Sequence, residues 1–149
     1  MIPDALLFSY AGRDGDLIKL TYRPNPNFQP PSREARVFHA MAGEMWVHES
    51  QHRLVRITGQ LVDDVKFAGR LLGHLEKGGH FAVEQSELAP GQWNLTLMEI
   101  EMKGKALFFK NIAVHQKESR KEFRAVPANL TLPDGAKLLR NEVVVAANY

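Results

Sequence analysis

The sequence contains no cysteine. This absence excludes disulfide bonds, thiolate metal sites and a cysteine nucleophile, and it leaves the redox compartment undecided. The chain also lacks any run approaching the roughly 18 apolar residues of a membrane-spanning helix. Residues 1–7 lack the basic stretch and sustained apolar core of a signal peptide. We therefore expect a soluble chain without a transmembrane segment, and its abrupt start in a strand pattern near Leu6 suggests a domain cut from a longer precursor.

No strong charge of one sign is present. The formal net charge is +2, and the lysines and arginines are spread along the chain rather than gathered in a run. A dispersed, mildly basic surface is weak support for nucleic-acid binding, so we expect no nucleic-acid partner. The 149 residues are 44% hydrophobic and 24% charged, the composition of an ordinary globular protein. This length predicts a single domain over residues 1–149.

Strand-period alternation dominates the sequence. In residues 55–61, for example, apolar and polar side chains point to opposite faces of a strand. The Pro-rich segment 24–32 favours an extended crossing loop over a recognition segment. Gly43 marks a bulge or a bend in the strand that follows it. Asp134 resembles the N-cap of a helix over residues 133–140, and the valines beyond it suggest a short strand or an apolar tail. Strands are expected at residues 6–11, 18–22, 36–48, 53–61, from 81, from 93, at 106–116 and at 123–126, and residues 65–67 form a further apolar patch. Residues 33–36 could open a helix, but the period of two shared by Val37, His39 and Met41 favours the strand.

These elements predict a mostly all-β fold, in which about eight strands form a curved antiparallel meander with a short C-terminal helix. The meander is expected to form a half or incomplete barrel. One strand supports this curvature directly, because Trp93, Leu95 and Leu97 alternate in one phase while Met98 and the residues after it alternate in the other. A change of phase within a strand indicates a bulge or bend.

The sequence carries no decisive catalytic or metal-binding signature. His74, Glu76 and His80 are usable ligand types, but their spacing matches no common zinc pattern, so polar loop residues are the favoured interpretation. Glu99 and Glu101 share a strand face and, with Lys103, are typical of a solvent-facing ladder rather than a catalytic carboxylate pair. Asp63 and Asp64 are neighbours, so in a strand their side chains point to opposite faces and cannot both act on one substrate unless the strand bulges. We expect no enzyme activity, no metal and no cofactor.

Large apolar side chains recur along successive strands, and the hydrophobic core is the first explanation for most of them. The alternative is an apolar groove or cavity at the bend of the sheet. Phe108 and Phe109 are neighbours and must face opposite sides of a strand, which indicates more apolar surface than one face can bury. The candidate ligand-lining residues are Trp46, Phe67, Leu71, Leu72, Phe81, Trp93 and Phe108.

Two segments resemble a known family. The run Gly43-Glu44-Met45-Trp46-Val47, followed by residues 52–57, resembles the lipoprotein-sorting (LolA/LolB-like) superfamily, in which a glycine, Trp-Val and a polar turn lead into a strand carrying arginines. Residues 65–67, 73–79 and 93–109 are similar to an uncharacterised bacterial branch with this architecture. The resemblance covers roughly residues 6–140. It implies an incomplete antiparallel barrel whose concave face accepts acyl chains, in the periplasm or cell envelope.

Two function classes follow from these observations. The first is a non-enzymatic module that binds lipid or lipoprotein acyl chains by burying apolar area. The second is a protein-interaction or structural domain that binds a partner, or a second copy as a homodimer, through a sheet edge or an apolar patch. A third and less favoured class is an enzyme that acts on small molecules and is built on a barrel scaffold. Co-purifying lipid or a ligand-free homodimer would separate the first two.

Overall fold

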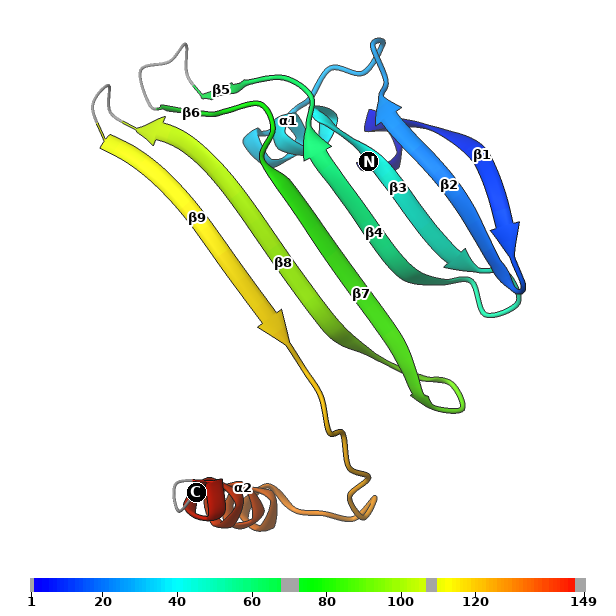
Figure 1. Ribbon diagram of the computed structural model, residues 1–149, viewed down its shortest axis with the longest axis vertical. Coiled ribbons are helices and arrows are strands. Elements are labelled where there is room, and N and C mark those ends of the chain that lie inside the picture. Colours follow the sequence, from blue (N-terminus) through cyan, green and yellow to red (C-terminus); the bar gives the residue numbers. More distant parts are fainter. Residues whose placement is uncertain (1, 68–72, 107–109, 147–149) are drawn as a thin grey trace.

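The computed structural model describes residues 2–67, 73–106 and 110–146. These residues form one nine-stranded antiparallel sheet with a helix near one end and another near the C-terminus (Figure 1). The predicted mostly β, open antiparallel fold with a C-terminal helix is therefore confirmed. The elements are a 3-10 helix at Ile2–Ala5, β1 (Leu6–Asp14), β2 (Leu17–Pro24), α1 (Arg33–His39), β3 (Met41–His48), β4 (Arg53–Leu61), β5 (Val65–Phe67), β6 (Gly73–Leu75), β7 (His80–Ala89), β8 (Gln92–Ala106), β9 (Lys110–Ser119) and α2 (Leu132–Ala146).

The strands are ordered as a meander with one inserted hairpin. From β1 to β4 and from β7 to β9, consecutive strands are neighbours, and β4 pairs with β7. The short hairpin of β5 and β6 interrupts this order and pairs with the far end of β8. In the described ranges, β1 and β9 are the outer long strands and do not pair with each other. The sheet is therefore open.

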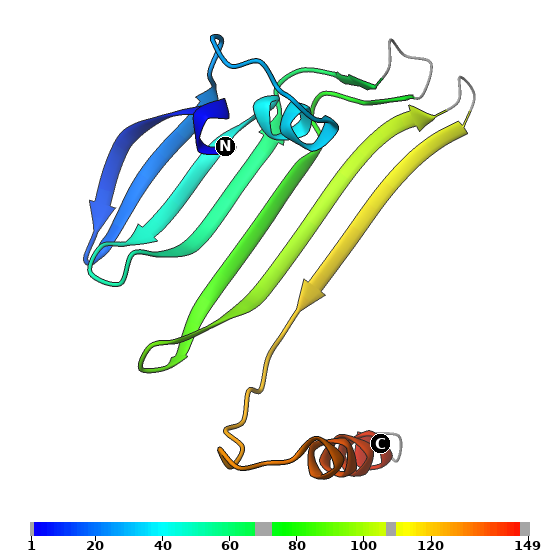
Figure 2. The same ribbon diagram turned by 180° about the vertical axis from the view of Figure 1, so that it is seen from behind.

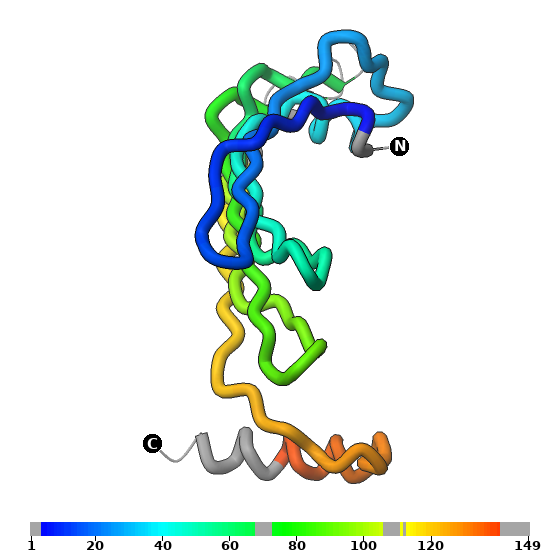
Figure 3. Tube along the Cα trace, turned by 90° about the vertical axis from the view of Figure 1, so that its right-hand side faces the viewer, coloured from blue at the N-terminus to red at the C-terminus, as the bar shows by residue number. Residues whose placement is uncertain are grey.

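The sheet is curved, and one of its faces is concave. Figure 3 shows it edge-on, with the loop after β2 and the turn after β3 bent toward the same side. Seen from behind, α1 crosses this side at one end of the sheet (Figure 2). There Val37 and Ala40 pack on a small core cluster. The buried members of that cluster are Tyr22, Met41, Leu61 and Val65.

Residues 33–39 form a helix, so the strand predicted over residues 36–48 begins only at Met41. Ser32 is the N-cap, and its side-chain oxygen accepts a hydrogen bond of 3.1 Å from the backbone N–H of Ala35. This cap satisfies a backbone donor that a strand would have to pair elsewhere. The period-two pattern of residues 37–41 was therefore misleading, because a segment this short fits both periods.

Several boundaries also differ from prediction. Gly43 pairs in regular register, and the bulge of this hairpin lies at Val55 in β4 instead. The strand that begins near residue 93 continues as β8 to Ala106, and the strand expected at residues 106–116 is β9 at Lys110–Ser119. Residues 123–126 are not a strand, and residues 143–145 belong to α2. The N-cap of α2 is Thr131 rather than Asp134, since the Thr131 hydroxyl donates to the Asp134 carboxylate (2.6 Å) and accepts from its backbone N–H (3.4 Å).

The predicted bulge in β8 is confirmed. Glu84 pairs with Leu97 and Gln85 with Leu95, so Thr96 is the extra residue. The Thr96 hydroxyl donates to the backbone oxygen of Glu84 at 3.3 Å, which fixes the bulge within the hairpin. Because one residue is skipped, Leu95 and the apolar residues from position 98 onward fall on the same face despite their opposite phases. The bulge thereby lengthens the apolar face of the sheet.

Candidate functional site

The concave face carries a continuous apolar row across five strands. Residues directly opposite each other in a β-ladder share a face. The register joins half-buried side chains from β2, β3, β4, β7 and β8 into one line across the sheet. That line consists of Leu20, Met45, Ile57, Val83 and Met98. It lies next to the core cluster under α1 but is itself only half-buried, so the apolar face extends beyond the part that α1 covers.

Methionine is concentrated on this face. The chain has five methionines, and four of them share the concave side of the sheet: Met41, Met45, Met98 and Met102. Methionine is unbranched and polarisable, so it adapts to ligands or partners of irregular shape and recurs at adaptable binding surfaces. Only Met41 among the four is buried. The composition of the face therefore suits an apolar ligand or partner of variable shape.

A pair of glycines lets the sheet hold a tyrosine across its concave face. Gly43 and Gly59 are directly opposite each other in β3 and β4. The ring of Tyr22 lies over this pair, and its hydroxyl donates a hydrogen bond of 3.0 Å to the backbone oxygen of Thr58. A Cβ at Gly59 would collide with the Tyr22 hydroxyl and would lie 2.9 Å from the Phe81 ring. The glycines therefore create the space in which the core under α1 assembles.

The ionisation of Tyr22 makes the stability of this core pH-dependent at high pH. Burial raises the pKa of the Tyr22 phenol to about 12 from its ordinary value of 10. The neutral phenol is favoured in the folded state, so its contribution is complete below pH 10 and is lost as the pH rises toward 12. We expect the free energy of unfolding to fall by about 2 kcal/mol over this interval. Urea unfolding between pH 9 and 12 measures the fall, and Tyr22→Phe should lack this component; an unchanged slope in the variant would contradict it.

At the end of the sheet away from α1, two turns are joined by a polar cluster. The Trp93 indole N–H donates to the Gln51 side-chain oxygen at 2.7 Å, and the Gln51 amide donates to Glu87 at 3.1 Å. The His48 ring packs edge-on against Trp93, with 6.0 Å between ring centroids. The backbone N–H of Gly91 and the Gln51 amide, both donating to Glu87, lower the pKa of that carboxylate. A carboxylate held charged in this way clamps the turns together and is a poor general base.

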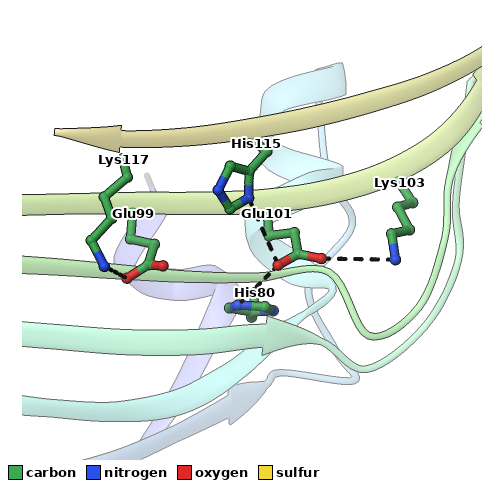
Figure 4. Close-up of polar contacts among 6 residues, drawn as sticks. All are labelled: His80, Glu99, Glu101, Lys103, His115 and Lys117. Carbon is green, nitrogen blue, oxygen red and sulfur yellow. Dashed lines mark ion pairs between the residues drawn. The ribbon is translucent and has the colours of Figure 1, made fainter.

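The convex face is polar and laced with ion pairs. Figure 4 shows the Glu101 carboxylate between His80 (3.7 Å), His115 (3.9 Å) and Lys103 (3.7 Å). Lys117 lies 3.4 Å from the neighbouring Glu99. The two glutamates are partly exposed and their basic partners are exposed, so each pair contributes little to stability. The predicted solvent-facing ladder of glutamates with Lys103 is confirmed, and the network marks this side of the sheet as the one that faces water.

Among the described residues, no group of three histidine, aspartate or glutamate side chains is arranged to hold a metal ion. His74 and Glu76 approach each other at 4.0 Å, while His80 pairs with Glu101 of β8 instead. The acidic neighbour Asp64 accepts a hydrogen bond of 2.9 Å from the backbone N–H of Lys77 and so fixes a turn. These contacts agree with polar structural roles.

The candidate lining residues fall into three groups. Phe67 and Phe81 pack on the core cluster, and Trp93 lies at the far rim of the concave face. Trp46 faces the convex side instead, opposite Lys19 and Arg56, with the Lys19 ammonium 5.4 Å from the centre of its ring. Leu71, Leu72 and Phe108 lie outside the described residues, as does Phe109 beside them in the sequence.

The lining prediction missed all five residues of the concave row, including Met45, Val83 and Met98. Their signal was present in the sequence as alternation within each strand. What was missing was the register, because only the pairing of strands shows that these residues form one continuous row.

The chain exposes far more surface than a compact protein of its size. Its accessible area is 10857 Å², whereas the scaling law for folded monomers gives about 7,700 Å² at a mass of 16.8 kDa. The excess is about 3,200 Å², and obligate protein interfaces bury about 2,000–5,000 Å² in total. The concave face and the C-terminal segment both contribute to this excess. The excess is therefore of the size that a stable protein interface buries.

Comparison with known proteins yields no match to a protein-family model, a curated protein or a solved structure. Within the described residues, neither helix combines the length and apolar character needed to cross a bilayer. The resemblance to lipoprotein-sorting proteins thus stays a prediction.

Proposed function

We propose that this chain is a non-enzymatic module that binds the acyl chains of lipids or lipoproteins on its concave face. The observation that carries the proposal is the apolar row of Leu20, Met45, Ile57, Val83 and Met98, which is half-buried and runs across the sheet beside a core closed by α1. The bacterial cell envelope is the proposed setting, and it rests on the resemblance alone.

The shape and chemistry of this face support an extended apolar ligand. An acyl chain laid along the row would contact side chains from several strands, with about 0.8 kcal/mol gained for each buried CH₂ group. The methionines allow the surface to adjust to chains of different length. Trp93 at the rim has an apolar ring and a hydrogen-bonded N–H, the combination suited to a boundary between acyl chain and water.

The proposal is tested with two neighbouring residues of β7 that point to opposite faces. Val83 lies in the concave row, and Ala82 lies on the convex face opposite Glu99. Val83→Lys places a charge in the apolar row, so we expect the affinity for palmitate, measured by isothermal titration calorimetry, to fall by at least about tenfold. Ala82→Lys adds the same charge to the polar side and should change the affinity by less than about twofold.

Two further measurements make the test decisive. Circular dichroism establishes that both variants keep the fold of the parent chain. Native mass spectrometry of the parent chain should show co-purifying fatty acid or phospholipid. Absence of both co-purifying lipid and saturable palmitate binding would overturn the proposal, as would an equal loss of affinity in the two variants.

A protein-interaction function is the second candidate, and the outer edge of β9 favours it. This ten-residue strand contains no proline and pairs with β8 without a register shift. Within the described ranges its other edge meets no strand, whereas the edge strand β1 is bulged at Ala11. A long regular edge is a template for strand addition. A stoichiometric protein partner without bound lipid would support this function over the first.

A further inference from the structure

The C-terminal arm, defined as residues 120–146, stands apart from the sheet. Its last part is α2, which begins after the Thr131 cap and runs for 15 residues. Figures 1 and 3 show α2 beyond the end of β9, separated from the strands of the sheet. The helix packs on its own connection, where a methyl group of Leu130 lies 3.6 Å from the place that a Cβ would take if Gly135 were alanine. The described part of α2 has no extensive contact with any strand.

The arm carries unpartnered apolar side chains. Leu132 is 92% exposed, Leu139 67% and Leu138 47%. Leu132 and Leu139 are seven residues apart and therefore lie on one side of the helix. A helix with an exposed leucine stripe gains stability only by burying it against another element. The molecule thus has two exposed apolar surfaces of complementary kind, a helix stripe and a sheet face.

The path of the arm directs α2 away from its own sheet. The backbone N–H of Arg120 bonds to the Thr96 oxygen at 2.9 Å, which holds the start of the arm at the edge of β8. Glu122 then adopts a positive φ of 57°, rare for a residue with a side chain, and the connection continues with exposed residues to Leu130. An extended connection that carries an apolar element off its own domain is the form of an exchanged arm.

We propose that this arm exchanges between two copies of the chain, so that α2 of each copy seats its leucines on the concave face of the other. The exchange is symmetric and closes as a dimer. It would draw on an exposed excess of about 3,200 Å² in each chain, which is ample for a stable dimer interface. The occupied part of the face is the half not covered by α1, around Met45, Val83 and Met98.

The exchange also regulates the proposed site, and this consequence rests on the proposed function. An acyl chain and α2 would occupy the same apolar row, so each excludes the other. The empty chain is then covered by its partner and protected from aggregation, and ligand binding separates the copies. The dimer itself is measured without lipid, so it stands or falls independently of lipid binding.

The oligomeric state gives the first test. In light scattering without lipid, the parent chain should have about twice the 16.8 kDa mass of one copy. Leu139→Glu should convert it to a single copy with an unchanged circular dichroism spectrum of the sheet. Lys137→Glu on the same helix, at a residue already 74% exposed in its side chain, should leave the dimer intact. A parent chain with the mass of one copy, or a Leu139→Glu variant that stays dimeric, would overturn the exchange.

Cross-linking decides which copy supplies the helix. The chain has no cysteine, so introduced thiols react without background. Leu139→Cys and Val83→Cys are prepared as two separate single variants and mixed under mild oxidation. A mixed disulfide between them, identified by mass spectrometry, joins α2 of one copy to the sheet of the other. A third protein carries both Leu139→Cys and Val83→Cys in one chain. If its disulfide forms within that chain, the helix covers its own sheet and the exchange is wrong.

Palmitate titration separates this inference from the proposed function. If both hold, Leu139→Glu binds palmitate more tightly than the parent chain, by at least about threefold, because the competing helix is removed. A parent dimer that never binds palmitate would refute the lipid function and leave the exchange standing. A parent chain that is a single copy and binds palmitate would refute the exchange and leave the lipid function standing.

Discussion

Gly43→Ala is expected to lower the free energy of unfolding by about 3 kcal/mol. A Cβ at this position would collide with the backbone oxygen of Thr58 and would lie 2.6 Å from the Cα of Gly59. These are backbone atoms of the neighbouring strand, so no side-chain rotation relieves the clash. The strands would have to separate where Tyr22 bonds to Thr58. Urea unfolding followed by far-ultraviolet circular dichroism measures the loss.

Gly135→Ala is the matched control for this substitution. Gly135 lies in the first turns of α2, where the nearest atom to an added Cβ is a methyl of Leu130 at the ordinary distance of 3.6 Å. Alanine is the better helix former, so we expect this change to be neutral or stabilising by up to about 1 kcal/mol. If Gly43→Ala were as stable as the parent chain, the close approach of β3 and β4 would not depend on the glycine.

Leu61→Ala is expected to cost about 3 kcal/mol. Leu61 is 1% exposed and is the largest side chain that is completely buried in the described residues. It lies between Tyr22, Met41 and Val65 in the only core cluster of that part of the chain. Because so few side chains are buried, this loss is a large share of the roughly 5–15 kcal/mol available to a domain.

Leu88→Ala makes the same chemical change at an exposed position. Leu88 is 39% exposed near the end of β7, so little buried area is lost and we expect a cost below about 1 kcal/mol. Thermal unfolding of the two variants side by side measures the difference. Equal costs would mean that the cluster under α1 is not the centre of stability of this fold.

The small core and the open apolar face have one physical origin. A single sheet with one helix across its end can bury only the part of its apolar face beneath that helix. Here α1 covers the rows near Met41 and Leu61, while the row through Ile57 and Val83 stays half-buried. The stability of the chain and its proposed binding function therefore depend on neighbouring parts of one surface. An occupant of the open row should also raise the stability of the fold.

The sequence predicted the class of the fold well because its strongest signals are local. Alternation with a period of two identified most strands, and the change of phase at Leu97 and Met98 identified the bulge that the structure places at Thr96. Helix α1 was missed although its cap was readable in the sequence, since Ser32 is followed by Glu34 and good helix formers. The β6 strand was missed because it has only three residues, and its pairing with β8 is distant in sequence.

The sequence predicted the apolar character of the candidate site but not the residues that form it. The expectation of large apolar side chains on a concave surface named Trp46, whereas the structure places this residue on the polar face beside Lys19. The residue pairs with Arg56, one position along from the Met45 and Ile57 pair, so it points to the face opposite the apolar row. Size and hydrophobicity cannot identify a face, because a shift of one residue exchanges the two sides of a strand.

By itself, the sequence determined that this protein is a cysteine-free, mostly antiparallel sheet with one apolar face and a C-terminal helix, because composition and alternation act over a few neighbouring residues. Only the tertiary structure decided which side chains share the concave face, that α1 covers one end of it, and that α2 leaves it open. These features depend on strand register and on contacts between distant segments. Alternation within one strand does not specify which residue of a distant strand lies opposite each of its residues.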